Sequence, residues 1–220
     1  MDLLFAHWRV DVDVLRPLVP EPLTVQTFDG DAWVGIVPFR MENVMRRGLP
    51  NLPGVSAFPE INVRLYVTHE GKPGVWFLSL DASNRLAVWA ARRFFYLPYV
   101  WSAIDVEATD ATFTYTSRRH SSPHDAPFDV TFQPTSGVYE AEPGTLAHWL
   151  TERYCLYAQS PDGTLFRGEV HHVPWPLRDA AAEIRTNDLL IPHGIMLSDT
   201  PDLLHASTGV DVALWNLERV

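Results

Sequence analysis

Lysine is almost missing from this sequence. Lys72 is the only lysine among 220 residues, and it lies in the segment Gly71-Lys72-Pro73-Gly74. Such a segment is typical of a turn, so the amine should be solvated and protonated at neutral pH. A lysine that forms a Schiff base needs a lowered pKa, supplied by an apolar pocket or a second cation. The sequence therefore argues against Schiff-base chemistry.

Cysteine and long apolar runs are scarce as well. Cys155 has no second cysteine for an internal disulfide, and its Tyr-Cys-Leu-Tyr setting is typical of a small buried hydrophobic residue. Residues 1–8 contain neither a basic stretch nor an apolar run long enough for a signal peptide or a membrane span. We therefore expect a cytoplasmic protein that does not enter a membrane.

Basic residues are outnumbered by acidic ones. The chain carries 17 Lys and Arg against 27 Asp and Glu, which gives a net charge of −10 at pH 7. This charge would repel a phosphate backbone, so we expect no nucleic-acid partner. The sequence also lacks the Gly-x-Ser-x-Gly elbow, the phosphate-binding loop and the dinucleotide fingerprint. We expect no cofactor, and the classes of enzyme that depend on these motifs lose most of their support.

What the chain does contain is alternating apolar and polar residues. Hydrophobic residues make up 46% of it, with eight Trp, seven Tyr and eleven Phe, which is typical of a globular protein with an aromatic core. Short helices are expected after Asp11, from Ser83 to about Phe95, and over 146–154. The expected strands cover 4–10, 23–28, 32–41, 60–67, 75–80, 99–107, 111–118, 128–133, 155–158, 164–173, 179–186 and 208–217.

This order of elements shows no regular exchange of strand and helix. It predicts a mainly β (α+β) fold with about three short helices, closed as a barrel and built as one domain over residues 1–220. The turn Asp29-Gly30-Asp31 predicts a hairpin between the second and third strands. Residues 46–59 are rich in proline and are predicted to form an ordered loop.

The strand expected over 60–67 has one apolar and one polar face. The polar face carries Glu60, Asn62, Arg64 and Tyr66. One interpretation is a solvated outer face, which is common for alternating charged residues. The other is that this face lines the barrel interior, where Glu60 would be a partly buried carboxylate able to act as an acid or a base. The sequence leaves both open.

The segment from Arg92 to Trp101 joins a predicted helix to a predicted strand and combines two arginines with five aromatic residues. Such a junction is suited to form the wall of an aromatic pocket of roughly 300–1,000 Å³. Arg85 and Arg92 share a helix face. In one interpretation Arg85 pairs with Asp81 at the start of the helix, while Arg92 and Arg93 complement its C-terminus; in the other, a guanidinium binds the carboxylate of a substrate.

Nine histidines raise the question of a metal site. His171 and His172 point to opposite faces of a strand, and His120 and His124 fall in a polar loop without the spacing of a structural zinc site. The pattern argues against a metal. His172 remains open as either a core histidine or a residue that contacts substrate.

Several segments together resemble an uncharacterised bacterial family, domain of unknown function 2071, over almost the whole chain. They are Leu18-Val19-Pro20-Glu21-Pro22-Leu23, Ser56-Ala57-Phe58-Pro59-Glu60-Ile61-Asn62-Val63-Arg64, Asn84-Arg85-Leu86-Ala87-Val88-Trp89 through Leu97-Pro98-Tyr99, Leu150-Thr151-Glu152-Arg153-Tyr154 and His172-Val173-Pro174-Trp175-Pro176-Leu177. That family is similar in fold to acetoacetate decarboxylase. The resemblance implies a β-barrel or cone that encloses a site for a small acid.

The decarboxylase pattern has an arginine, a proline six residues later and then two lysines, the first of which forms the Schiff base. Arg92 and Pro98 match this pattern, whereas Tyr99 and Val100 stand where the lysines would be. The pocket glutamate of that family falls on Glu60. The resemblance therefore implies the scaffold without the covalent decarboxylase chemistry.

We first expect a barrel that binds a small molecule such as a carboxylate and uses non-covalent acid/base chemistry on a small organic acid. Its catalytic residues would be Glu60 and Tyr99. Its substrate-binding residues would be Arg92, Arg85, Asn62, Tyr66 and His172. An alternative is a non-catalytic ligand sensor or carrier, and a third is metal-dependent hydrolysis through His120, His124 and His172. A homo-oligomer would suit the fold.

Overall fold

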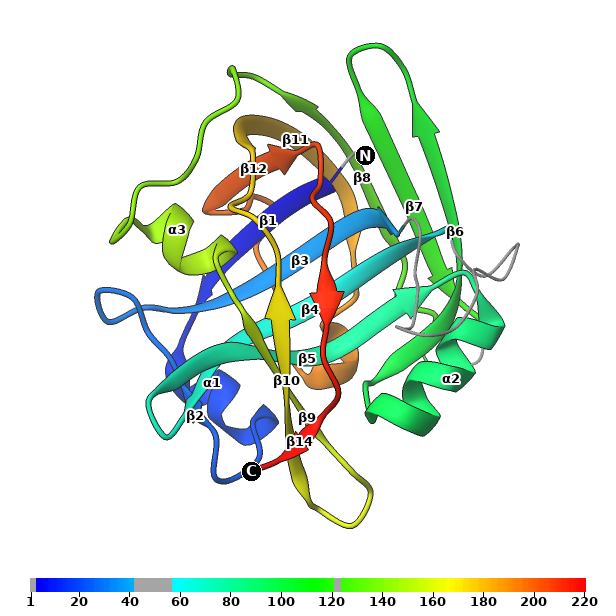
Figure 1. Ribbon diagram of the computed structural model, residues 1–220. Helices are drawn as coiled ribbons and strands as arrows, with labels where there is room; N and C mark the ends of the chain where they lie inside the picture. The colour runs from blue at the N-terminus through cyan, green and yellow to red at the C-terminus, as the bar shows by residue number, and fades with distance from the viewer. Residues whose placement is uncertain (1–2, 42–56, 121–123) are drawn as a thin grey trace.

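The computed structural model describes residues 3–41, 57–120 and 124–220 (Figure 1). The helices are α1 (Val12–Leu15), α2 (Arg85–Phe95) and α3 (Leu146–Thr151). The strands are β1 (Leu3–Val10), β2 (Thr24–Val25), β3 (Ala32–Met41), β4 (Phe58–His69), β5 (Lys72–Ala82), β6 (Tyr99–Ala108), β7 (Phe113–Arg119), β8 (Phe128–Pro134), β9 (Cys155–Gln159), β10 (Leu165–His171), β11 (Leu177–Asn187), β12 (Leu203–Ser207), β13 (Ala213–Leu214) and β14 (Glu218–Arg219). Within these ranges, no helix is long and apolar enough to cross a membrane.

In the described part of the chain, nine strands close into a barrel. They follow the order β6, β7, β8, β11, β12, β1, β3, β4 and β5, and β5 closes the ring by pairing with β6. The β5–β6 pair is parallel, and the neighbours around the rest of the ring are antiparallel. The predicted fold, mainly β with three short helices and a barrel, is confirmed.

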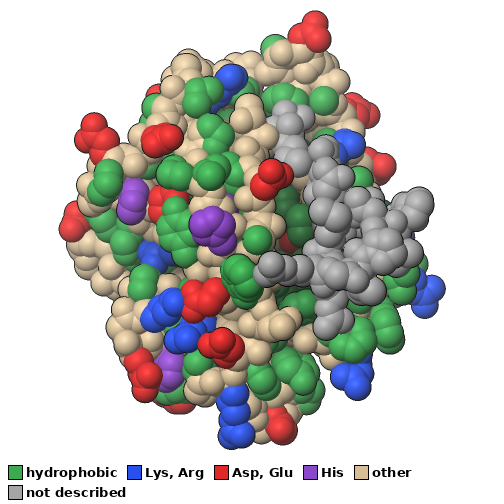
Figure 2. Space-filling view, viewed as in Figure 1, with side chains coloured by type: hydrophobic (Ala, Val, Ile, Leu, Met, Phe, Trp, Pro, Cys, Tyr) green, Lys and Arg blue, Asp and Glu red, His purple; other side chains and the backbone are tan. Residues whose placement is uncertain are grey.

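Apart from β2, which pairs with β4, the remaining strands form a layer outside the barrel. β9 pairs with β5 at Val75 and Trp76, β10 pairs with β9, and the short strands β13 and β14 both pair with β10. In Figure 1 this layer crosses in front of β3, β4 and β5, with α3 on one side of it and α2 on the other. Figure 2 shows the same side of the molecule, where acidic and basic side chains are interspersed. The outer face of β3, β4 and β5 is therefore covered.

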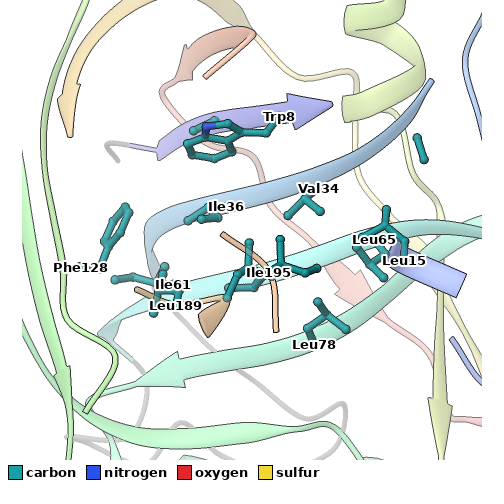
Figure 3. Close-up of a cluster of buried hydrophobic side chains, with 14 of the residues drawn as sticks. Trp8, Leu15, Val34, Ile36, Ile61, Leu65, Leu78, Phe128, Leu189 and Ile195 are labelled. Carbon is teal, nitrogen blue, oxygen red and sulfur yellow. The ribbon is translucent and has the colours of Figure 1, made fainter. Parts of the chain in front are cut away.

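The barrel interior is packed with apolar side chains. One buried cluster draws residues from β1, β3, β4, β6, β7 and β8, which are strands from all around the ring. Figure 3 shows Trp8, Ile36, Ile61 and Phe128 converging with Leu189, which comes from the segment after β11. On β7, β8 and β11 the alternate residues are exposed or half-buried. Residues of the barrel strands that belong to this cluster therefore point inward, and their neighbours in sequence point outward.

A second buried cluster lies on the outward side. It includes Trp33 of β3, Tyr66 of β4 and Leu80 of β5, and it packs against Val88 of α2 and Leu156 of β9. Helix α2 begins at Asn84, whose side chain accepts hydrogen bonds from the backbone N–H groups of the next turn. It ends at Tyr96, which has a left-handed backbone conformation. This abrupt end turns the chain directly into β6.

Two local predictions differ from the structure. The predicted hairpin is wrong as a strand pair, because β2 pairs with β4 and only the bridge between Phe28 and Asp31 closes the turn. The cap of α2 is Asn84 rather than Ser83. Most of the predicted loop over 46–59 lies outside the described residues, and its last two positions, Phe58 and Pro59, already belong to β4.

Close contact between β5 and β9 depends on Gly74. A Cβ atom there would lie 2.8 Å from Cε2 of Tyr157 and 2.9 Å from the backbone oxygen of Cys155. Because a backbone atom cannot rotate away, we expect Gly74→Ala to lower the free energy of unfolding by about 1–3 kcal/mol. Gly137→Ala is the matched control, since a Cβ there meets nothing within 4 Å. Urea denaturation would measure both, and equal midpoints would contradict the prediction.

Candidate functional site

Glu60 and Tyr99 meet on the outward face of the barrel. Glu60 pairs with Ala82 on β5, while Tyr99 starts β6 and pairs with Leu80, two residues along the same strand. The Tyr99 hydroxyl donates a hydrogen bond to Oε2 of Glu60 over 2.9 Å. Both side chains are buried, with residue exposures of 1% and 7%. The structure thus brings together the two residues that the sequence predicted as catalytic.

Burial controls the ionisation of this pair. Removal from water raises the pKa of Glu60 from its ordinary 4.5 to about 8, and the negative charge of Asp81 adds to the increase. The hydrogen bond from Tyr99 acts in the opposite direction but is the weaker effect. Burial and the neighbouring Glu60 raise the pKa of Tyr99 well above 10.0. At neutral pH, Glu60 is mainly a neutral carboxyl group that can give up its proton within reach of ordinary pH.

This pKa predicts a pH dependence of stability. The native protein holds a proton on Glu60 up to about pH 8, whereas the unfolded chain releases it near 4.5. The resulting stabilisation is complete below pH 4.5 and is lost as the pH rises to about 8, by at most about 1.4 kcal/mol per pH unit. Urea denaturation between pH 5 and 8 should show this decline for the wild type and not for Glu60→Gln. If the wild type and Glu60→Gln differ in free energy of unfolding by the same amount at every pH, the prediction is contradicted.

Arg92 and Arg85 are not brought into contact with Glu60. Val88 of α2 packs on the barrel wall with Ala87, Ala91 and Phe95, whereas both arginines are exposed. Arg92 donates from Nε to the backbone oxygen of Tyr99, and the guanidinium of Arg85 lies 5.2 Å from the centre of the Trp101 ring. The two arginines therefore lie against the backbone and the aromatic ring of β6 and do not reach the Glu60 carboxyl. This placement does not fit the role of a buried carboxylate anchor.

The polar face of β4 is buried, but it is not the face that lines the barrel interior. Ile61 and Val63 belong to the interior cluster, so Glu60, Asn62, Arg64 and Tyr66 point outward, beneath the covering layer. The sequence offered a solvated outer face or a face that lines the barrel interior. The structure shows a third arrangement, in which the polar face lies on the outside of the barrel but is buried. Oδ1 of Asn62 is buried without a hydrogen-bond partner among the described residues.

Residues that the sequence did not mark as site residues gather around Tyr66. Its hydroxyl accepts a hydrogen bond from Nε of Arg64 over 3.1 Å and lies 2.7 Å from Nε2 of His7. The guanidinium of Arg153 lies 5.0 Å from the centre of the Tyr66 ring. Arg64 was visible in the strand pattern. For His7 and Arg153 the sequence offers no signal, because their burial depends on contacts between distant segments.

The side chain of His172 lies near Arg153 and contacts the residues that flank both of them, Val173 and Tyr154. Its Nδ1 lies 2.8 Å from the backbone oxygen of Val173, and its ring stacks on Tyr154 with centroids 4.5 Å apart. His120 stacks on Trp101 at 4.1 Å. Over residues 3–41, 57–120 and 124–220, no three His, Cys, Asp or Glu side chains are grouped so that they could hold a metal ion.

Asp81 pairs with Arg119 inside the barrel, and not with Arg85 as the sequence suggested. Nε and Nη2 of Arg119 donate to the two carboxylate oxygens of Asp81 over 2.7 and 2.9 Å. Ser102 donates to the same carboxylate over 2.9 Å, and Ser79 accepts from Nη2 of Arg119 over 2.9 Å. The carboxylate of Asp81 is therefore satisfied, and the pair lies on the other side of the barrel wall from Glu60.

Lys72 is remote from Glu60 and is already paired. Its amine donates to a carboxylate oxygen of Glu169. Lys72 lies ten residues along β5 from Ala82, the partner of Glu60, which at about 3.3 Å per residue places it about 33 Å away. It cannot reach a ligand at the Glu60–Tyr99 pair.

Two cavities lined by described residues lie elsewhere on the protein. One of about 290 Å³ is bordered by Arg9, Asp11 and Asp31, and one of about 350 Å³ by Asp105, Arg118 and Asp129. Neither includes Glu60 or Tyr99. The aromatic pocket predicted from the segment 92–101 stays a prediction.

Comparison with known proteins identifies the family of this chain. The family model DUF2071, described as an uncharacterized conserved protein, matches residues 1–211. The chain belongs to this family. The protein YqjF of Bacillus subtilis (strain 168), also described as uncharacterized, is 44% identical over 218 residues, which cover 99% of this chain and 89% of YqjF.

Solved structures show the fold that this DUF2071 chain shares. The enduracididine biosynthesis enzyme MppR complexed with pyruvate is 14% identical, with a TM-score of 0.69, and the match covers 99% of this chain and 87% of MppR. An acetoacetate decarboxylase is 15% identical, also with a TM-score of 0.69, and the match covers 100% of this chain and 86% of the decarboxylase. The chain therefore has the acetoacetate decarboxylase-like barrel.

Proposed function

We propose that this protein is an enzyme that transfers a proton at the carbon beside the carbonyl group of a small organic acid, without a covalent intermediate. Glu60 is the acid/base group. Tyr99 is a positioning residue that holds the Glu60 carboxyl and lowers the energy of its ionised form. The observation that carries the proposal is the buried Glu60 carboxyl, hydrogen bonded to Tyr99, whose pKa of about 8 lies close to neutral pH.

The proton-transfer step needs no lysine. The ionised Glu60 takes a proton from the carbon beside the carbonyl, and the electron pair of that C–H bond moves onto the carbonyl oxygen to give an enolate. The reverse step returns the proton. In solvent-exposed surroundings a carboxylate is too weak a base for this step, and the raised pKa of Glu60 brings its basicity closer to that required.

The similar structures support a small acid as the substrate class. MppR was solved with pyruvate, and the decarboxylase name specifies acetoacetate. This chain has Tyr99 and Val100 where the decarboxylase pattern has lysines, and Lys72 is remote. We therefore carry over the class of ligand and not the covalent mechanism.

The test follows hydrogen exchange directly. Wild-type protein is incubated with pyruvate or acetoacetate in D₂O, and proton NMR records loss of the signals beside the carbonyl. The exchange rate should rise with pH and level off above about 8, as Glu60 ionises. Borohydride added with pyruvate should leave the protein mass unchanged. Binding of either acid without exchange at any pH would reject the proposal in favour of a sensor or carrier.

Tyr99→Phe gives a second, smaller prediction. The variant removes the hydrogen bond that lowers the pKa of Glu60, so the pH at which exchange levels off should move upward. At pH 7 we expect the exchange rate to fall roughly ten-fold, the value of one hydrogen bond to a charged group. An unchanged pH profile would show that Tyr99 does not act through Glu60.

A further inference from the structure

Arg64 and Arg153 are two buried cations without an acidic partner in the part of the chain that the structure describes. Their residue exposures are 8% and 7%. Among the described residues, no Asp or Glu forms an ion pair with either of them. Glu152 precedes Arg153 in sequence, but its carboxylate accepts hydrogen bonds from the Trp175 backbone and the Tyr154 hydroxyl. A buried charge is costly unless it is paired, so this arrangement needs an explanation.

The two guanidinium groups are neighbours. They lie 5.5 and 5.0 Å from the centre of the same ring, that of Tyr66. Arg64 donates to the Tyr66 hydroxyl and to the backbone oxygen of Leu150. Burial and the positive charge of Arg64 both lower the pKa of Arg153, to about 10, which still leaves Arg153 protonated at pH 7. Two like charges therefore share one dry region of a chain whose net charge is −10.

The contacts of Arg153 leave one of its three nitrogens without a hydrogen-bond partner among the described residues. Nε donates to the backbone oxygen of Trp149 over 2.6 Å, and Nη1 donates to Oε1 of Gln26 over 2.7 Å. Nη2 is buried and has no hydrogen-bond partner among the described residues. The guanidinium also lies 4.2 Å from the centre of the Trp149 ring. Arg153 is thus held in place by three neighbours while one donor remains unmatched.

His7 supplies a further unmatched ring nitrogen on the same wall. It pairs with Gly35 on β3, which in turn pairs with Arg64 on β4. Burial and Arg64 lower the pKa of His7, so the ring is neutral. The Tyr66 hydroxyl, which accepts from Arg64, lies 2.7 Å from Nε2 of His7, so one ring nitrogen of His7 is occupied by this contact. Nδ1 of His7 has no partner in the described part of the chain.

We propose that Arg64 and Arg153, with His7, form a binding site for a small carboxylate between β4 and α3. The ligand supplies the missing negative charge and accepts from the unmatched Nη2 of Arg153, with Nδ1 of His7 on the same wall. A planar carboxylate suits two guanidinium planes held beside aromatic rings, because it can accept two parallel N–H bonds. Arg64 lies four residues along β4 from Glu60, about 13 Å, so the site is separate from the Glu60–Tyr99 pair and stands whether or not Glu60 transfers a proton.

The first experiment uses the unchanged protein. Isothermal titration calorimetry with pyruvate, its neutral analogue pyruvamide and inorganic sulfate measures binding to the wild type, and thermal denaturation is recorded with the same compounds. Pyruvate should bind and raise the Tm, and pyruvamide should bind at least ten-fold more weakly. Absence of pyruvate binding would overturn the site. Equal affinity for sulfate would overturn its assignment to carboxylates.

The second experiment tests the residues. Arg153→Gln should raise the Kd for pyruvate more than ten-fold, and Arg153→Lys, which keeps the charge but not the paired N–H groups, should have an intermediate effect. Arg9→Gln is the matched control, since Arg9 also lies over a tryptophan ring but its side chain is 58% exposed. Near-ultraviolet circular dichroism confirms that each variant is folded. Wild-type affinity in folded Arg153→Gln would overturn the proposal.

Glu60→Gln separates this site from the proposed function. It should lower the rate of hydrogen exchange by about 10²- to 10⁴-fold while leaving pyruvate affinity within about two-fold of the wild type, because Glu60 lies outside the arginine site. If Glu60→Gln loses exchange while both Glu60→Gln and Arg153→Gln bind pyruvate with wild-type affinity, the arginine site is rejected and the enzyme is kept. Binding lost in Arg153→Gln, with no exchange in the wild type, would keep the arginine site and reject the enzyme.

Discussion

Replacing Glu60 with Gln is expected to lower the rate of hydrogen exchange into pyruvate or acetoacetate by about 10²- to 10⁴-fold, which is the usual contribution of a positioned acid/base group. Glutamine keeps the shape of the side chain and can still accept the hydrogen bond from Tyr99. It cannot take up or release the proton. The loss should therefore appear in the rate constant at saturating substrate, with little change in substrate affinity.

The pH profile identifies the group responsible. In the wild type the rate should follow the ionisation of Glu60, with a midpoint near pH 8. The residual rate of Glu60→Gln should lack this midpoint. Glu107→Gln is the matched control, because Glu107 is an exposed glutamate on β6, the strand that carries Tyr99. A Glu60→Gln variant that retains the wild-type rate and midpoint would show that another group moves the proton.

Replacing Arg119 with Met is expected to lower the free energy of unfolding by about 3–5 kcal/mol. The change leaves the Asp81 carboxylate buried without its cation, and an uncompensated buried charge has a cost of this size. The side chains of Arg119 and Asp81 are 4% and 0% exposed, so water cannot replace the lost partner. Urea denaturation at pH 7 would measure the change from the shift in the midpoint.

A double variant distinguishes loss of charge pairing from loss of packing. Asp81→Asn with Arg119→Met removes both charges, so it should be more stable than Arg119→Met alone by about 1–3 kcal/mol. The hydrogen bond from Ser102 can still be accepted by the asparagine side chain. If the double variant is instead less stable than Arg119→Met, the pair contributes through shape rather than charge.

The strand pattern of β4 shows how much of the fold and of the site could be predicted from the sequence. Alternation at Ile61 and Val63 predicted a strand with one polar face, and the resemblance placed Glu60 opposite Tyr99. Which face points inward depends on closure of the barrel, which brings strands distant in sequence onto the same apolar side. Local periodicity contains no information on closure, and so the burial of the polar face beneath an outer layer was not foreseen.

The arginines show which contacts could not be predicted from the sequence. Arg85 and Arg92 are close to aromatic residues in the sequence, yet helix α2 packs on the barrel through Ala87, Val88, Ala91 and Phe95, and both arginines stay exposed. Arg153 was not predicted as a site residue, because Gln26 and Tyr66, which it contacts, lie far away in the chain. Asp81 and Arg119 are 38 positions apart. In each case the contact that decides the role is formed only when distant segments pack together.

The two faces of β4 also limit how this protein can change during evolution. Substitutions on its outward side can alter the buried polar contacts without touching the barrel interior, and those on its inward side alter packing alone. A single inserted or deleted residue is different, because it would turn Glu60 and Arg64 into the apolar interior and bring Ile61 and Val63 to the outside. Homologues should therefore vary freely in the composition of this strand while keeping its length between Glu60 and Tyr66 constant.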